Sequence, residues 1–262
     1  MGAFLVVQFS VLGDSHIGAS GSETIYRKVL KQAVRNSKFI IHGGDAIDST
    51  TNPGEQEKIR RFQLFKTITK EYTGTYYYNI GNHDLFPYQG ASDLFREHVA
   101  NDFVSVVNLP GTQVKLVRLN NARGRFSLPS LSLVRMLHPS DYYIFDFHWP
   151  LYGGNLVQSF TNFDTDKIPQ SHAMTREATQ EFFNALRLST LPRSHILAIF
   201  THHAHKFVKK TCNFPNGYSN IKNFVCGCAG AHACPRPGYY QVFITRAGQN
   251  YDLFVQHIPL TR

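Results

Sequence analysis

Short apolar runs alternate with amphipathic segments along the first third of the chain. The runs at 4–12 (FLVVQFSVL), 37–44 (SKFIIHGG) and 75–80 (TYYYNI) have the length and hydrophobicity of buried strands. Between the first two runs, apolar residues recur at helical spacing over Ser22–Lys38. A second amphipathic segment separates the second run from the third. This order of strand, helix, strand, helix and strand favours parallel strands that are covered by helices.

The second amphipathic segment carries its own start signal. Asn52 suits the N-cap, Pro53 the first helical position, and Glu55 the far side of a capping box. The apolar face of the predicted helix consists of Ile59, Phe62, Phe65 and Ile68. We therefore expect a helix that begins just after Asn52 and packs on the sheet.

The rest of the chain is richer in consecutive strands. Strand-like runs occur at Val114–Leu119, Tyr142–Phe147, Ile196–Thr201, Tyr239–Thr245 and Leu253–His257. One further amphipathic helix is predicted around Thr175–Leu188. We interpret Gly153–Arg176 and the cysteine-bearing segment 211–238 as loops around a site. No repeat or linker divides the sequence, so we expect a single layered α/β domain over residues 1–262.

The composition narrows the class of protein. Hydrophobic residues make up 42% of the chain and aromatic residues 13%, which is ample for a packed core. The net charge of +9 favours anionic partners such as phosphate esters, nucleic acid or acidic membrane surfaces. No stretch approaches the roughly 20 apolar residues that span a bilayer. The run at 4–12 lacks a basic flank and a cleavage site, so we expect a buried strand there and not a signal peptide.

The four cysteines lie close together near the C-terminus. They are Cys212, Cys226, Cys228 and Cys234. Disulfides in an oxidising compartment, a structural zinc site and free buried thiols all remain open, although the usual pair of C-x-x-C knuckles is missing. The cluster therefore leaves an extracytoplasmic location possible, and the sequence fixes neither the compartment nor the oligomeric state.

Polar residues follow each of the first three predicted strands. The segments are Gly13-Asp14-Ser15-His16, Gly43-Gly44-Asp45-Ala46-Ile47-Asp48 and Gly81-Asn82-His83-Asp84. Two later strands also end in histidines, at His148-Trp149-Pro150 and at 201–205 (THHAH). Turn capping explains any one segment, but open α/β sheets bind ligands at the carboxyl ends of their strands. We therefore expect these groups to converge on one site.

The order of these motifs resembles the calcineurin-like metallophosphoesterase family. The motifs are D-x-H, G-D-x-x-D, G-N-H-D, a histidine after a strand, and H-x-H, and they cover residues from about 12 to 206. The resemblance implies a four-layer α/β/β/α sandwich with two metal ions at the strand ends. Residues 207–262 would add C-terminal strands and the cysteine-containing loop. It also implies that phosphoric esters are hydrolysed by a metal-bound hydroxide.

The same resemblance assigns the ligands. One ion would be bound by Asp14, His16 and His205, the other by Asn82, His148 and His203, and Asp45 would bridge both. Carboxylate, imidazole and amide ligands suit Mn, Fe or Zn, so the ligand types do not select the metal. Two cations about 3.5–4 Å apart suit both the attacking and the leaving oxygen of a phosphoryl transfer.

Three neighbouring residues have two possible roles each. His83 would stay off the metals and either protonate the leaving alkoxide or stabilise charge on the phosphoryl oxygens. Asp84 would orient this imidazole or cap the turn. Asp48 would support a ligand histidine or cap its own loop.

Two features depart from the family pattern or compete with it. His202 stands where a glycine usually precedes H-x-H, and alternation along an extended segment places it on the side opposite His203 and His205. His138 is a rival to His148 as the histidine after a strand. We prefer His148, because a clear strand leads directly into it.

The substrate is less constrained than the metal centre. We predict a phosphodiesterase, since a histidine beside the metal-binding asparagine can give the leaving group its proton. A phosphomonoesterase or phosphoprotein phosphatase is the alternative, and an inert binding scaffold is a third reading. Nucleic acid fits the charge, but no basic stripe with interleaved aromatics indicates it. Arg123, Arg125 and Lys206 are either phosphate contacts or solvated side chains.

Overall fold

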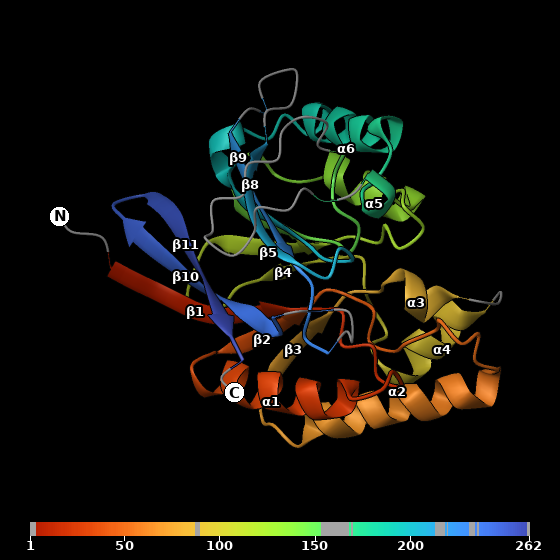
Figure 1. Ribbon diagram of the computed structural model, residues 1–262. Helices are drawn as coiled ribbons and strands as arrows, with labels where there is room; N and C mark the ends of the chain where they lie inside the picture. The colour runs from red at the N-terminus through yellow and green to blue at the C-terminus, as the bar shows by residue number, and fades with distance from the viewer. Residues whose placement is uncertain are drawn as a thin grey trace.

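The computed structural model describes residues 4–86, 90–152, 168, 170–212, 218, 220–230, 234 and 236–260. Two β-sheets lie face to face, and helices cover their outer faces (Figure 1). The four-layer α/β/β/α arrangement expected from the sequence is confirmed. Among the described residues, no helix has both the length and the hydrophobicity needed to cross a membrane.

The first sheet has five strands in the order β11-β10-β1-β2-β3. Their bounds are β1 Phe4–Leu12, β2 Phe39–His42, β3 Thr75–Tyr78, β10 Gly238–Ala247 and β11 Asn250–Pro259. The three N-terminal strands are parallel, as the apolar runs predict. β10 pairs antiparallel with β1 and with β11, so the C-terminal strands complete the first sheet.

The second sheet has six strands in the order β4-β5-β6-β7-β9-β8. Their bounds are β4 Ser105–Asn108, β5 Val114–Arg118, β6 Tyr142–Asp146, β7 Ile196–Thr201, β8 Phe207–Cys212 and β9 Ile221–Cys226. The four inner strands are parallel, and the edge strands β4 and β8 are antiparallel to their neighbours. The loops that follow the parallel strands therefore lie together at one end of each sheet.

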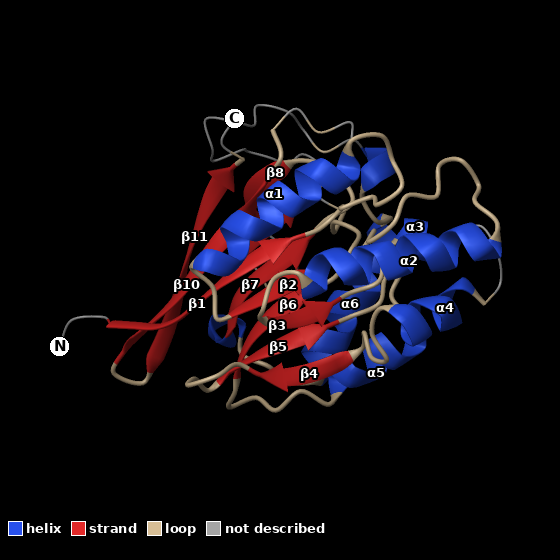
Figure 2. Ribbon diagram, turned by 90° about the horizontal axis from the view of Figure 1, so that it is seen from below, coloured by secondary structure: helices blue, strands red, loops and turns tan. Residues whose placement is uncertain are grey.

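Apolar side chains fill three layers of core. Phe9, Phe200 and Val242 belong to the cluster between the two sheets. On the outer face of the first sheet pack α1 Ser22–Arg35, α2 Glu55–Lys70 and α4 Ala91–His98. On the outer face of the second sheet pack α5 Leu128–Arg135 and α6 Arg176–Leu188. Figure 2 shows α1 and α2 lying over the strands. This packing fixes the strand ends from which the site is built.

The start of the second helix differs from the prediction. The helix begins at Glu55 with Gly54 in extended backbone as its cap, and Asn52 instead occupies the left-handed region at φ 53°. The backbone N–H of Asn52 donates to the carbonyl of Ser49, so Asn52 closes a turn. A positive φ is incompatible with the extended N-cap conformation, so Asn52 cannot serve as the cap.

The cysteine-bearing segment is only partly a loop. Residues 207–212 and 221–226 form β8 and β9, which the prediction missed because glycine, proline and asparagine dominate the stretch between and after them. Cys228 and Cys234 form a disulfide, while Cys226 is a free buried thiol. The side chain of Cys212 and most of the predicted loop 153–176 lie outside the described residues.

Candidate metal centre

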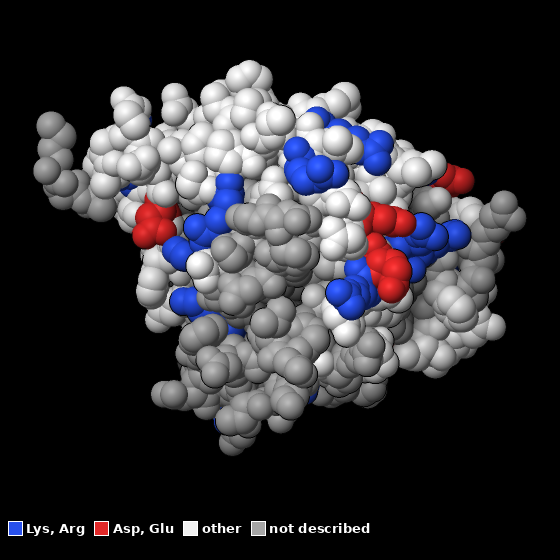
Figure 3. Space-filling view, turned by 90° about the horizontal axis from the view of Figure 1, so that it is seen from above, with Lys and Arg blue, Asp and Glu red and all other residues white. Residues whose placement is uncertain are grey.

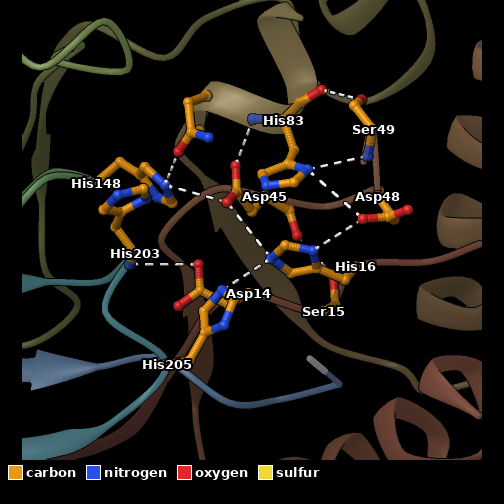
Figure 4. Close-up of polar contacts among 12 residues, drawn as sticks. Asp14, Ser15, His16, Asp45, Asp48, Ser49, His83, His148, His203 and His205 are labelled. Atoms are coloured by element: carbon orange, nitrogen blue, oxygen red, sulfur yellow. Dashed lines mark hydrogen bonds and ion pairs between the residues drawn. The ribbon is translucent and has the colours of Figure 1, made fainter. Parts of the chain in front are cut away.

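Loops at the carboxyl ends of parallel strands bring the predicted ligands together. The loops follow β1, β2 and β3 in the first sheet and β6 and β7 in the second. Figure 4 shows the side chains of Asp14, His16, Asp45, His148, His203 and His205 facing one another. The residues predicted from separate parts of the sequence thus meet at one place.

The backbone at these strand ends adopts an unusual conformation. The left-handed region is occupied by Asp14 (φ 54°), His16 (47°), Asp45 (53°), His203 (64°) and His205 (51°). Side chains with a Cβ atom are disfavoured in this region. The conformation turns the chain sharply after β1, β2 and β7, so that these side chains point back over the sheet edge.

The Asp45 carboxylate lies at the middle of the cluster. Its Oδ2 atom is 3.4 Å from Nε2 of His16 and 3.3 Å from Nε2 of His148. Its Oδ1 atom accepts a hydrogen bond of 2.8 Å from the backbone N–H of His83. Asp45 is fully buried. One carboxylate therefore contacts both halves of the cluster without competition from solvent.

The first half of the cluster combines two carboxylates and two imidazoles. Ligand atoms of Asp14, His16, Asp45 and His205 all lie within 4.8 Å of one another. The Nε2 atoms of His16 and His205 face each other at 3.2 Å. The Oδ1 atom of Asp14 accepts from the backbone N–H of His203 at 3.3 Å, which ties this half to the second.

The second half combines Asp45 with imidazoles and an amide. Ligand atoms of Asp45, His148 and His203 lie within 4.8 Å of one another. The side-chain oxygen of Asn82 is 2.9 Å from Nε2 of His148. Trp149 stacks on the ring of His203 at a centroid distance of 3.7 Å, which fixes the plane of that ring.

Unpaired ligand atoms show that this cluster fits cations. Within the described part of the chain, Oδ2 of Asp14, Oδ2 of Asp45 and Nδ1 of His203 are buried without a hydrogen-bond partner. Leaving a buried polar atom unsatisfied costs about 1–3 kcal/mol. A divalent cation satisfies carboxylate oxygens and imidazole lone pairs at the same time. Two groups of ligands that share Asp45 therefore fit two metal ions.

The fold is similar to that of solved structures, whereas two comparisons of the sequence find no match. No protein-family model and no curated protein matches the chain. Among solved structures it is similar to a dimetal phosphatase from Danio rerio, at 11% identity and a TM-score of 0.68, covering 98% of this chain and 100% of that one. The chain has the calcineurin-like metallophosphoesterase fold.

Two further structures with this metallophosphoesterase fold are longer than the chain. A purple acid phosphatase from yellow lupin (Lupinus luteus) seeds has 13% identity and a TM-score of 0.57, covering 97% of this chain and 53% of that one. The NAD nucleotidase of Haemophilus influenzae has 10% identity and a TM-score of 0.55, covering 99% of this chain and 50% of that one. The chain thus spans about half the length of either protein.

Burial and the nearby charges change the pKa values of the histidines in the cluster. Burial acts to lower the pKa of His16, but Asp45 and Asp48 outweigh it and raise the pKa to about 10. Burial is likewise outweighed by Asp45 at His148, whose pKa rises to about 9. Burial, reinforced by His148, lowers the pKa of His203 to about 2. A cation must therefore displace protons from His16 and His148, whereas His203 is already neutral.

The ring of His83 is held in one tautomer. Its Nδ1 atom accepts a hydrogen bond of 2.9 Å from the backbone N–H of Ser49, so the proton of the neutral ring is on Nε2. Burial lowers the pKa of this imidazole, which favours the neutral form. The hydroxyl of Ser49 also donates to the carbonyl of His83 at 2.5 Å. His83 can therefore present a fixed N–H donor beside the cluster.

Asp84 faces the backbone. Its Oδ2 atom accepts from the N–H of Gly81 at 2.8 Å and its Oδ1 atom from the N–H of Ile47 at 3.3 Å. Burial and the charge of Asp45 raise the pKa of Asp84 to about 7. These contacts favour the turn-capping role over the orientation of His83, whose ring is bound by Ser49.

Asp48 has both of the roles that the sequence allows. Its Oδ1 atom is 3.5 Å from Nδ1 of His16, which places it behind this ligand ring. Its Oδ2 atom accepts from the hydroxyl of Thr50 at 2.8 Å, which caps its own loop. Arg61 closes this layer by donating to the carbonyl of Asp48 at 2.7 Å.

His202 points away from the cluster, as predicted, but not by simple alternation, because His203 and His205 lie in the left-handed region. Its Nε2 atom is 3.0 Å from Oδ1 of Asp146, and its Nδ1 atom donates to the carbonyl of Cys226 at 2.6 Å. Asn79 donates to the other side of the Asp146 carboxylate. We call Asn79, Asp146, His202 and the carbonyl of Cys226 the inter-sheet network. Asp146 and Asn79 were not predicted, because both look like ordinary strand-end residues in the sequence.

The rival histidine lies elsewhere. His138 precedes β6 and its Nδ1 atom is 2.7 Å from the hydroxyl of Ser140, whereas His148 follows the same strand and enters the cluster. Since a strand separates the two residues, they lie at opposite ends of the sheet. Sequence reasoning missed the contact between Trp149 and His203, which only the meeting of β6 and β7 creates.

Proposed function

We propose that the chain is a metal-dependent phosphoester hydrolase that holds two cations and prefers phosphodiesters. The observation that carries the proposal is the buried Asp45 carboxylate, which faces His16 and His148 at 3.4 and 3.3 Å within a cluster of unpaired ligand atoms. Such a shared carboxylate is suited to a dinuclear centre. The metallophosphoesterase fold agrees with this reading.

The cations would be held by residues from both sheets. Asp14, His16 and His205 would bind one ion, Asn82, His148 and His203 the other, and Asp45 both. Mixed carboxylate, amide and imidazole ligands suit Mn, Fe or Zn. When bound, the cations act as Lewis acids on a phosphoryl oxygen and activate water for attack.

His83 supplies the hydrogen-bond donor that the cations cannot provide. Because the Ser49 amide faces Nδ1, the neutral ring directs its Nε2–H away from the backbone. A neutral donor stabilises charge that develops on a phosphoryl or leaving-group oxygen. Of the two roles predicted for His83, the tautomer favours charge stabilisation over complete proton transfer.

The charges beside the centre support a diester preference. Lys58 donates to the carbonyls of His83 and Asp84 at 3.0 and 2.9 Å, and Arg61 donates to the carbonyl of Asp48. The side chains of Lys58 and Arg61 are therefore both engaged with backbone carbonyl groups behind the cluster. At neutral pH a phosphodiester carries one negative charge and a monoester close to two. A centre whose nearby Lys and Arg are already engaged suits the diester.

Paired chromogenic substrates test the proposal. The purified protein is stripped with a chelator, reloaded with Mn²⁺ and assayed on bis(p-nitrophenyl) phosphate and p-nitrophenyl phosphate. We expect turnover to depend on metal and kcat/KM for the diester to equal or exceed that for the monoester. A higher value for the monoester would make the protein a phosphomonoesterase. Inactivity on both substrates with metal bound would leave a binding scaffold.

A further inference from the structure

A cavity beside the candidate centre combines arginines with an apolar wall. It has a volume of about 430 Å³, and its lining includes Leu85, Arg96, Phe103, Arg123, Arg125 and Phe126. The net charge of +9 is thus partly gathered in one place. On the face shown in Figure 3, the Lys and Arg side chains form separate patches and not one continuous stripe.

The cavity adjoins a helix that carries one of the candidate ligands. Leu85 is the last residue of α3 (Asn82–Leu85), which begins with the candidate ligand Asn82. One helical turn advances by about 5.4 Å, so the cavity begins within one turn of that ligand. On the opposite wall, Asn121 donates to the carbonyl of Trp149, which stacks on His203. Arg123 and Arg125 extend from this same loop.

The arginines of the cavity are able to accept an anion. Arg96 donates to Asp93 at 2.8 Å, and Arg125 donates to Glu181 at 3.2 Å. Both pairs are exposed, and exposed ion pairs contribute only about 0–1 kcal/mol. Arg123 is exposed and forms no ion pair with any residue that the structure describes. A phosphate can therefore replace weak partners at two guanidinium groups and occupy the third directly.

We propose that this cavity binds a second anionic group of the substrate, on the same molecule as the reacting phosphate. The substrate class is then an organic phosphodiester that bears an additional phosphate, with its apolar or aromatic body against the exposed Leu128 of the lining. Guanidinium groups bind phosphate through two parallel hydrogen bonds, which gives both affinity and orientation. The placement of the reacting phosphate rests on the proposed function, but the anion site itself does not.

Equilibrium binding tests the cavity without turnover. Protein held in chelator is titrated by calorimetry with adenosine 5′-monophosphate and with adenosine, which lacks the phosphate. We expect the monophosphate to bind about tenfold more tightly, since one charge-assisted contact accounts for such a ratio. The variant Arg123→Ala/Arg125→Ala should bring the ratio close to one. Arg35→Ala is the matched control, because Arg35 is an exposed arginine in the last turn of α1.

Each outcome has one meaning. Equal affinity of wild-type protein for adenosine 5′-monophosphate and adenosine, or an unchanged ratio in the double variant, would overturn the proposed anion site. A reduced ratio in Arg35→Ala would also overturn it, since the preference would then reflect overall charge. Hydrolysis of bis(p-nitrophenyl) phosphate by Mn-loaded wild-type protein is measured separately. Its absence counts against the proposed function and leaves the binding result intact.

Discussion

His202 and His203 are neighbours in the chain, yet their rings belong to two different regions. His202 lies in the inter-sheet network, where both ring nitrogens face fixed oxygen atoms of Asp146 and Cys226. His203 lies in the candidate metal centre, where its Nδ1 atom is buried without a partner. A histidine whose nitrogens are both engaged stabilises the fold. A histidine with a buried nitrogen that lacks a partner, such as His203, is able to bind a ligand.

The same contrast applies to the acids of the two regions. Asp146 is held by His202 and Asn79, whereas Asp14 and Asp45 each keep one buried oxygen without a hydrogen bond. Burial therefore does not distinguish the regions, since Asp14, Asp45 and Asp146 are all fully buried. What distinguishes them is whether both oxygens of the carboxylate have a hydrogen-bond partner in the protein, as those of Asp146 do.

The largest effect should follow from removing the shared carboxylate. Asp45→Ala deletes the group that faces both halves of the centre, so we expect loss of bound metal and a fall in turnover of about 10⁴-fold. Elemental analysis and the diester assay measure the two quantities. Retention of two ions per chain in the variant would show that Asp45 does not bridge them.

Removing the neutral donor should reduce turnover and leave the metals in place. We expect His83→Ala to lose about 10³-fold in kcat, within the range of a positioned donor. Ser49→Ala is the matched control. Since the Ser49 backbone N–H holds the tautomer, this variant should lose less than about tenfold in kcat. Loss of metal from His83→Ala would make His83 a ligand.

Replacing each of the two adjacent histidines by alanine, in separate variants, distinguishes the two regions directly. His202→Ala leaves the Asp146 carboxylate buried without its ring partner, so we expect a loss of about 3 kcal/mol in the free energy of unfolding. His203→Ala should change the stability of chelator-treated protein much less, while it weakens metal binding. Urea unfolding and metal titration of both variants decide the matter. Equal loss of stability in the two variants would contradict the distinction between the two regions.

The smallest effect concerns pH. The raised pKa values of His16 and His148, about 10 and 9, mean that both rings are protonated at pH 7 before metal binds. Metal uptake then releases protons, so affinity rises with pH by up to about a hundredfold per unit if both are lost. The same protonated rings stabilise the metal-free fold below pH 6.5, and this contribution is lost as pH rises through 9 and 10. Calorimetry in buffers of different ionisation enthalpy counts the protons. Metal uptake with no proton release would contradict the charge state inferred for the rings.

Features carried by local pattern could be predicted from the sequence. The apolar runs located β1, β2, β3, β6 and β7, and their parallel order placed the polar segments at one edge. The separation of His202 from His203 and His205 was also predicted correctly, but alternation is not its cause, because the chain after β7 turns through left-handed residues and is not extended.

Features that depend on two sheets meeting could not be predicted. Asp146 and Asn79 contact each other only because β6 and β3 lie in facing sheets, and their sequence positions are far apart. The strand β9 was missed for a related reason. Its pattern is brief and surrounded by turn-forming residues, and pairing with β7 and β8 is what makes it a strand.

A left-handed backbone is unfavourable for stability, yet the candidate ligands adopt it at five positions: Asp14, His16, Asp45, His203 and His205. Glycine occupies this conformation at almost no steric cost, whereas other residues are disfavoured by about 1–2 kcal/mol. Asp45→Gly should therefore unfold at a higher urea concentration than Asp45→Ala, although both lack the carboxylate. Glycine at these turns would relieve the backbone strain, but it would leave nothing at the edge of the sheets to hold a cation.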